Sequence, residues 1–438
     1  MTWNFSDLEA WDDKIAKLAL SYGLDWFPIT YEVCDYYEMI GHMSYHGMPS
    51  HYQHWSFGKK FERTHQMYNL GAEGLPYELI INSNPSIAYL MKQNALYLQI
   101  LIMAHCVGHS DFFKNNRMFK ETRPESIVSR LRNARKRIQK YTEDPLIGLK
   151  KVESFLDNVH TISMQTERNN RKRLTREQIK SKKISEYNSK KEKLKSTVPI
   201  PDLSKSLLEP DRDLLSFLIE HGKHFEDWQL DILSIVRDES QYFLPQIKTK
   251  IINEGWASFW HYKLMNELDL PQDIHIPFLK THNQVIRPHL GGINPYHIGF
   301  HIFKKIEEKA GLSECFLIRE IHEDISAVRV YLDEEDIRDL NLFTYSKKEQ
   351  GDLIIDDVAD EEGWKKIKSD LIRSIGDNSI PKVIVSDMTQ SGKLILNHVH
   401  DGRDLDLQYA NPVVDSIQNI WPENVKFFTI IEEEPWEI

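Results

Sequence analysis

The sequence predicts an α+β protein, in which a mainly α-helical N-terminal part is followed by a small C-terminal α+β domain with an antiparallel sheet. Three observations support this prediction. The chain has 438 residues, enough for two or three domains at roughly 150 residues each. Apolar residues recur at helical spacing through most of residues 1–310. Short runs rich in β-branched residues then appear after residue 315.

Residues 1–162 form the first predicted domain, which is helical. The run YELIINSN, residues 77–84, has the composition of a strand or an extended segment. Pro85 is suited to the first turn of the long apolar helix expected after it. The helices predicted in this domain cover residues 8–22, 31–43, 86–116, 125–142 and 145–158.

Residues 163–212 interrupt the apolar pattern. Lysine and arginine far outnumber acidic residues there, and apolar residues are sparse. Such a segment buries too little surface to offset the entropy lost on ordering. We therefore interpret it as a solvated linker or a protruding helix rather than an RNA-binding arm.

Helical spacing resumes over residues 213–310, and its character changes again at 315–438. Helices are expected from residue 214, over 228–242 and over 246–268. In the last segment, AVRVYL, KVIVSDM, KLILNHVH and KFFTIIE are typical of strands, TQSG of a turn and VVDSIQNIW of a helix. These runs predict the small antiparallel α+β domain.

Composition limits the classes of protein to consider. Hydrophobic residues make up 41% and charged residues 28% of the chain, the balance of a soluble globular protein. The net charge of −11 argues against general binding to nucleic acid. Three dispersed cysteines predict no disulfide framework. Neither a secretory signal nor an apolar run long enough to span a bilayer is evident, so a cytoplasmic protein is expected.

The segment LQILIMAHCVGHSDFF carries the first sign of chemistry. His105 and His109 stand four residues apart in an apolar helix, so both imidazoles project from one face and can grip one metal ion. The spacing is that of an HExxH zinc helix, but Cys106 stands where the general-base glutamate would be.

A second segment, KIINEGWASFWHY, supplies a third ligand. Glu254 and His261 lie two helical turns apart in an aromatic helix, where a carboxylate is costly unless it is paired or bound to a cation. An HxxGH helix followed by an EGWA helix resembles the gluzincin metallopeptidases, which implies a zincin-like fold for the helical part. His105, His109 and Glu254 are thus the predicted ligands of a divalent metal, with zinc expected and one position open for water. The alternative is a buried polar network in which His261 simply satisfies Glu254.

Catalytic roles are predicted for Glu38 and His261. Glu38, or Glu32 beside it, could replace the absent helix glutamate as base, since a run rich in histidine and aromatic residues follows. His261 is expected to stabilise an oxyanion or to support a ligand. A surface loop with incidental histidines is the other interpretation of this run. Glu239 is a further carboxylate that could face the same cavity; the other interpretation is a salt bridge with Arg237 or another base.

Several of these blocks together resemble the SpoVR family (stage V sporulation protein R). They include HGMPSHYQHWSFGKKF, ELIINSNPSIAYLM, AHCVGHSDFFKNN, INEGWASFWHY and INPYHIGF, spread over residues 10–300 and continuing more loosely to the C-terminus. The resemblance implies a part in spore formation, chiefly in cortex and coat assembly, and a PrkA-type serine kinase as a partner. It implies no settled catalytic activity.

Three functions follow as hypotheses. The first is a metal-dependent hydrolase, an amidase or a peptidase, in which zinc activates water and a carboxylate takes the proton. The second is a catalytically inactive regulatory or scaffold protein of spore formation that keeps the metallopeptidase-like fold. The third is a dinuclear iron or manganese site that uses Glu38, Glu239, Glu254 and the histidines.

Overall fold

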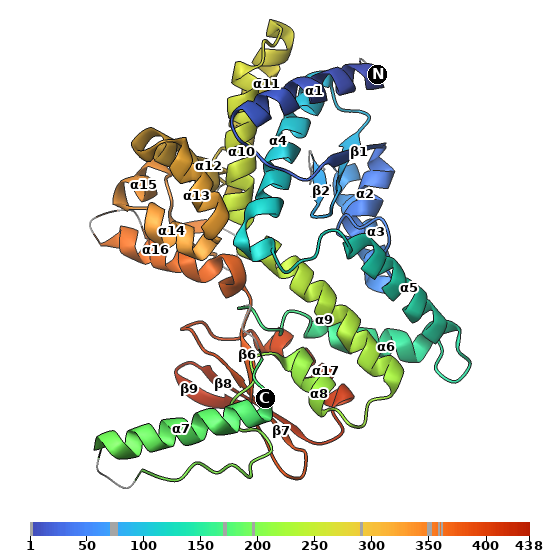
Figure 1. Ribbon diagram of the computed structural model, residues 1–438, viewed down its shortest axis with the longest axis vertical. Coiled ribbons are helices and arrows are strands. Elements are labelled where there is room, and N and C mark those ends of the chain that lie inside the picture. The colour runs from blue at the N-terminus through green and yellow to red at the C-terminus, as the bar shows by residue number, and fades with distance from the viewer. Residues whose placement is uncertain are drawn as a thin grey trace. The chain divides into compact units, whose positions relative to one another are not determined.

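The computed structural model describes residues 3–70, 78–169, 173–194, 198–289, 292–347, 353–357, 360 and 362–438. Over these residues the chain forms seventeen α-helices and nine strands, which confirms the α+β class. The chain divides into two compact units (Figure 1). The first comprises Met1–Gln139 and Pro245–Ser379, and the second comprises Lys140–Leu244 and Ile380–Ile438.

The first unit is mainly helical and has two small sheets. Its helices are α1 (Phe5–Ser21), α2 (Tyr36–Ser44), α3 (Trp55–Asn69), α4 (Leu96–Asn115), α10 (Lys250–Glu267), α11 (Gln272–Val285), α12 (Pro295–Ala310), α13 (Leu312–Ile321), α14 (Asp324–Tyr331), α15 (Glu334–Asp339) and α16 (Gly363–Ser374). Its strands are β1 (Ile29–Cys34), β2 (Leu79–Ile81), β3 (Ser86–Met91), β4 (Thr344–Lys347) and β5 (Leu353–Asp357).

The second unit combines helices with one four-stranded sheet. Two helices, α5 (Ile127–Glu143) and α9 (Asp227–Lys248), contain two of the three boundaries between the units, and the third follows Ser379. The other helices are α6 (Leu149–Thr161), α7 (Arg176–Leu194), α8 (Leu214–His221) and α17 (Leu407–Ile420). The strands are β6 (Val383–Met388), β7 (Leu394–His398), β8 (Val425–Ile431) and β9 (Glu434–Glu437).

The core of the first unit is built around α4. Every residue of this helix from Leu98 to Phe113 is buried. A helix that is apolar on all sides needs neighbours on all sides, and α10 packs along α4 while α12 packs against α10 (Figure 1). Helices α1, α11 and α13 also contact α4. The predicted HxxxH helix is therefore the most deeply buried element of its unit.

Glycine lets these helices approach closely. A Cβ atom added at Gly108 of α4 would lie 2.7 Å from the Cα atom of Ala257 in α10. A Cβ atom at Gly299 of α12 would lie 2.6 Å from the Cα atom of Gly255 in α10. Because these backbones lie so close, side chains on the facing turns of α4, α10 and α12 can contact one another.

The sheets correct the predicted strand arrangement. The four-stranded sheet has the order β6-β7-β8-β9, and its central pair β7–β8 is parallel while the outer pairs are antiparallel. The prediction of an antiparallel sheet was wrong. In the sequence, helix α17 connects β7 to β8, and this crossover lets β8 run in the same direction as β7. In the first unit β3 is central, parallel to β1 and antiparallel to β2.

Three predicted helix or strand assignments were also wrong. Residues 86–91 form strand β3 rather than the start of the long helix, which begins at Leu96. Residues 29–34 form β1, and α2 begins only after the capping residue Asp35. The run AVRVYL lies mainly in helix α14. Each is a short apolar run, whose composition alone does not distinguish a buried strand from a buried helix.

The two compact units do not coincide with the domains predicted along the sequence. Residues 315–379 belong to the first unit and residues 380–438 to the second. Within 163–212 the chain forms α7, and none of the residues of α7 is buried. The division of the chain into domains at 1–162, 163–212, 213–310 and 315–438 stays a prediction.

The N-terminus of α10 depends on a carboxylate from another helix. Thr249 makes no side-chain capping bond, but Asp324 of α14 accepts hydrogen bonds from the backbone N–H groups of Ile251 and Ile252, at 2.9 and 3.0 Å. Asp324 is 1% exposed, so no water replaces it. We expect Asp324→Ala to lower the free energy of unfolding by about 2 kcal/mol, because two buried N–H groups lose their acceptor.

Chemical denaturation would measure this change. Asp324→Asn is the matched control, because its amide keeps one acceptor oxygen and should lose less stability than the alanine variant. Equal stability of all three proteins would contradict a capping role for Asp324.

Candidate metal centre

Four side chains of the first unit converge on one point. They are Glu78, which directly precedes β2, His105 and His109 of α4, and Glu254 of α10. One nitrogen or oxygen atom from each lies within 4.8 Å of the other three. Nε2 of His105 is 3.6 Å from Oε1 of Glu78 and 3.5 Å from Oε2 of Glu254. Nε2 of His109 is 3.3 Å from the same Glu254 oxygen.

The spacing of these atoms fits a small cation. Ligand atoms about 2.0–2.1 Å from a tetrahedral zinc ion lie roughly 3.3 Å from one another, close to the separations of 3.6, 3.5 and 3.3 Å in this cluster. Nε2 of His105 and Oε2 of Glu254 are also buried without any hydrogen-bond partner. Buried polar atoms without partners are rare because they are costly. Two imidazoles and two carboxylates therefore fit a divalent metal that would satisfy both atoms.

The cluster is accessible from its carboxylate side. The side chains of His105 and His109 are 2% and 5% exposed, whereas those of Glu78 and Glu254 are 13% and 18% exposed. A ligand reaching the centre would therefore meet the two carboxylates before the two imidazoles.

The charges of the cluster are strongly coupled. Burial acts to raise the pKa of the Glu254 carboxyl, but His109 and His105 outweigh burial and hold this pKa well below its usual range. Burial acts to lower the pKa of His109, but Glu254 outweighs it and the pKa is raised. Glu254 is consequently an anion at neutral pH, as a metal ligand must be.

Asn253 orients His109. Its Oδ1 lies 2.9 Å from Nδ1 of His109, and an amide oxygen can only accept, so this imidazole nitrogen donates. In the neutral ring the proton is then on Nδ1, and the lone pair of Nε2 is directed toward Glu254. Metal-ligating histidines usually have such a partner on the second nitrogen.

Two further histidines lie behind His105. Nδ1 of His261 is 2.9 Å from Nδ1 of His105, and Nε2 of His261 is 2.8 Å from Nδ1 of His282 in α11. Burial, together with His105 and His282, holds the pKa of His261 well below its usual value. Burial, together with His105, lowers the pKa of His282 to about 4. Both rings are therefore neutral at pH 7.

Tyr296 of α12 completes the cluster on the carboxylate side. Its hydroxyl donates a hydrogen bond to Oε1 of Glu78 at 3.3 Å, and its ring stacks on His105 with centroids 6.1 Å apart. Burial raises the pKa of this phenol well above its usual value, and Glu254 and Glu78 raise it further. Tyr296 therefore remains a hydrogen-bond donor at neutral pH.

The structure brings together His105, His109 and Glu254, the three predicted ligands. His261 lies in contact with His105 on the side away from the carboxylates, which is the supporting position rather than that of an oxyanion stabiliser. Glu38 lies outside the cluster: its exposed carboxylate accepts a hydrogen bond from the backbone N–H of Asp35 at 2.7 Å and so caps α2. A predicted base at the start of a helix can equally well be a capping residue.

The dinuclear hypothesis also loses its extra carboxylates. Neither Glu239 of α9 nor Glu38, which caps α2, belongs to the four-residue cluster. In the described part of the chain, the four-residue cluster is the one group of three or more such side chains placed to hold a metal ion. It provides donors for a single ion.

Sequence reasoning missed Glu78, Tyr296 and His282. Glu78 is the second residue of the strand-like run YELIINSN, and nothing local shows that this end of the run faces α4. The signal for His282 was present, because Ile274, Phe278 and His282 recur every four residues on the buried face of α11. A histidine on such a face needs a polar partner.

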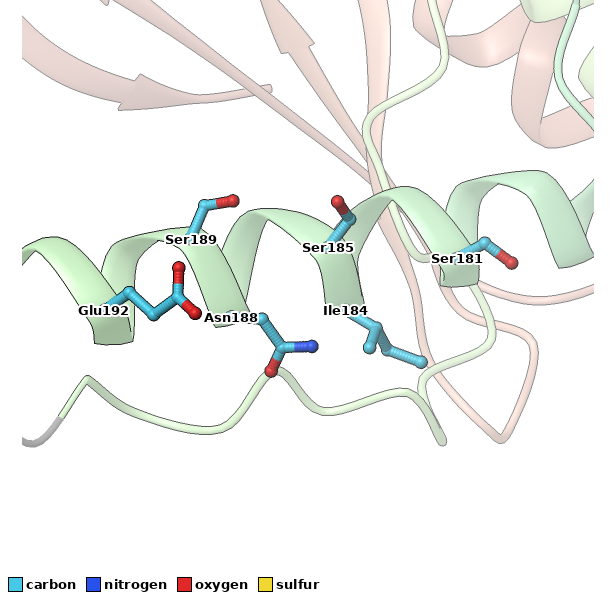
Figure 2. Close-up of a pocket in the computed structure, with 6 residues that line it drawn as sticks. All are labelled: Ser181, Ile184, Ser185, Asn188, Ser189 and Glu192. Carbon is cyan, nitrogen blue, oxygen red and sulfur yellow. The ribbon is translucent and has the colours of Figure 1, made fainter.

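The second unit has a hollow of a different kind along α7. Ser185 and Ser189 point to one side of the helix, and Ile184 and Asn188 point to the other (Figure 2). The hollow is lined by Ser181, Ile184, Ser185, Asn188, Ser189 and Glu192. With one ionisable side chain, it cannot assemble the donors that a metal or an acid–base pair requires.

Comparison with known proteins agrees with the sequence blocks. The family model described as SpoVR like protein matches residues 2–380. The "Uncharacterized protein YcgB" of Escherichia coli (strain K12) is 35% identical over 413 residues, which cover 84% of this chain and 80% of that protein.

The solved structures add nothing to this picture, since none matches the chain significantly. A zincin-like fold therefore stays a prediction. Among the described helices, none combines the length and the apolar composition needed to cross a bilayer.

Proposed function

Since this chain belongs to the SpoVR family, we propose that it acts in spore formation, in cortex or coat assembly, as a metal-dependent hydrolase of the amidase or peptidase class. One observation carries the enzymatic part. Two nitrogen and two oxygen donors converge from three separate segments, and two of these atoms are buried without partners. Zinc is the metal that this donor set and spacing favour.

The residues divide into ligands and a base. His105, His109 and Glu254 would hold the metal, which would lower the pKa of a bound water to about 7 and polarise a carbonyl oxygen. Glu78 is the more suitable base than Glu38, because one of its oxygens lies in the cluster and its side chain is partly exposed. It can take a proton from water and return it to a leaving amine.

Tyr296 assists Glu78. Its hydroxyl donates to Oε1 of Glu78 at 3.3 Å, which orients the carboxylate. As a protonated donor beside the cluster, it is also placed to stabilise negative charge that develops on a carbonyl oxygen.

A regulatory protein without catalysis is the second candidate. One observation favours it: Cys106, at the place of the zincin base, is fully buried, and burial raises its thiol pKa well above the usual value, so it cannot take part in chemistry. In such a protein the cluster would retain the metal for stability, and partners such as a PrkA-type serine kinase stay a prediction.

Glu78→Gln separates the two candidates. We expect this variant to keep its metal, because three ligands remain, but to lose at least about 100-fold in hydrolysis because the base is gone. The assay would incubate zinc-loaded protein with a quenched peptide library and with purified peptidoglycan, and mass spectrometry would identify products.

Glu38→Gln is the matched control, since this exposed glutamate of the same unit caps α2 and lies outside the cluster. Product formation by this variant but not by Glu78→Gln would support the hydrolase. Metal-loaded wild-type protein that cleaves none of these substrates would favour the regulatory candidate.

A further inference from the structure

Three buried histidines form a continuous chain through the core of the first unit. His105, His261 and His282 come from α4, α10 and α11, and their facing nitrogens are separated by 2.9 and 2.8 Å. The three residues are 2%, 1% and 1% exposed. At this degree of burial, the facing nitrogens of the three rings are hydrogen-bond partners of one another.

This chain of three histidines has only two consistent arrangements of protons. A neutral imidazole has one N–H donor and one acceptor nitrogen. If Nε2 of His105 offers its lone pair to a cation, then Nδ1 of His105 carries the proton and donates it to His261. His261 must in turn carry its proton on Nε2 and donate to Nδ1 of His282. In the reverse arrangement, Nε2 of His105 is protonated and cannot bind a metal.

We propose that His261 and His282 are positioning residues that hold His105 in the metal-binding tautomer. This inference rests on the metal site of the proposed function but not on hydrolysis. His282 accepts a hydrogen bond from Nε2 of His261 and so keeps the His261 proton on that nitrogen. Nδ1 of His261 is then left with its lone pair and can accept the hydrogen bond from Nδ1 of His105.

The two metal-binding histidines are therefore oriented differently. His109 has an amide oxygen as its partner, from Asn253, and this oxygen permits only one tautomer. His105 has another imidazole, which permits both tautomers until something further along selects one. His282 is the next ring along this histidine chain, and it packs against the rings of Phe278, Tyr262 and Phe300.

Packing and proton direction can be separated by substitution at residue 261. Glutamine offers an oxygen acceptor toward His105 and an N–H donor toward His282, so it preserves the direction of the chain. Leucine fills a comparable volume but can neither accept nor donate. A purely packing role would treat both variants alike.

Metal affinity of the purified full-length chain is the readout. Zn²⁺ binding would be measured by competition with a chromophoric chelator, and the absorption spectrum of the Co²⁺-loaded protein would report the ligand geometry. We expect His261→Leu to bind Zn²⁺ about 10–100-fold more weakly and His261→Gln to remain within about threefold of wild type. His282→Leu should lose about tenfold, since one partner of His261 remains.

His275→Leu is the matched control. This histidine also lies on α11, where it contacts Asn266 rather than the histidine chain, and we expect unchanged affinity. Thermal melting of each metal-free variant would show that the fold is kept. If His261→Leu does not fold, the metal affinity of His282→Leu, compared with that of wild type and His275→Leu, decides whether the positioning role holds.

Two results would overturn parts of this picture separately. Wild-type affinity in both His261→Leu and His282→Leu, or equal losses in His261→Leu and His261→Gln, would refute the positioning role while leaving the metal site intact. Failure of the wild-type protein to bind Zn²⁺ or Co²⁺ at all would refute the metal site itself, and with it the proposed function.

Discussion

Glu254→Ala is expected to remove the metal from the purified protein. Glu254 contributes the oxygen that lies 3.5 Å from Nε2 of His105 and 3.3 Å from Nε2 of His109, so its loss removes both a ligand and the only carboxylate of α10 at the centre. Loss of a direct ligand should weaken binding by more than about 100-fold, beyond the 10–100-fold typical of supporting residues. Elemental analysis should find about one equivalent of zinc in wild-type protein and essentially none in the variant.

The metal-free variant should still fold. Oε2 of Glu254 has no hydrogen-bond partner in the protein, so truncation removes only its ion pairs with His105 and His109. His105→Ala should give the same loss of metal. Glu38→Ala is the matched control, because this carboxylate caps α2 and lies outside the cluster.

Full metal content in Glu254→Ala would mean that Glu78 and the two histidines suffice, and the assignment of ligands would be wrong. Iron or manganese in the wild-type protein would keep the site and change the chemistry proposed for it.

Gly299→Ala should produce the largest loss of stability. The added methyl group would lie 2.6 Å from the Cα atom of Gly255 in α10, and backbone on both sides leaves no flexible side chain to move away. Forcing extra atoms into a tight helix contact costs typically 1–3 kcal/mol, and we expect about 3 kcal/mol here. Thermal melting of metal-free protein would measure it.

The same substitution should also disturb the four-residue cluster. Helix α10 carries Glu254 and α12 carries Tyr296, so a shift between the two helices displaces both side chains. Gly58→Ala is the control: its Cβ atom would meet nothing within 4 Å, and alanine in the helix α3 should raise stability by about 1 kcal/mol. Equal melting temperatures for the two variants would show that the α10–α12 contact is not tight.

The sequence alone predicted what depends on spacing within one element. The pair His105 and His109, one helical turn apart, faces one point because every α-helix places residues i and i+4 together. Glu254 stood out because a carboxylate among aromatic residues needs a counter-charge. The helices near residues 8–22, 125–142, 145–158, 228–242 and 246–268 were predicted for the same local reason, through their apolar spacing.

Tertiary structure decided which residues meet across elements. Glu78 joins the cluster because β2 pairs with β3 on the same sheet as β1, and no local pattern encodes that pairing. Glu38 looked similar in sequence but is used to cap its own helix. Residues 29–34 and 86–91 became strands because each supplied the other with a hydrogen-bonding neighbour.

The lack of local information about distant contacts also explains the other features that the sequence did not predict. Periodicity records which face of a segment is buried, but not which distant segment covers that face. The division of residues 315–438 between two units, the parallel pairing of β7 with β8 and the chain of histidines behind His105 all depend on contacts between segments remote in sequence. The sequence therefore determined the helices that carry the predicted ligands, whereas the folded chain determined the complete four-residue cluster and the residues that orient it.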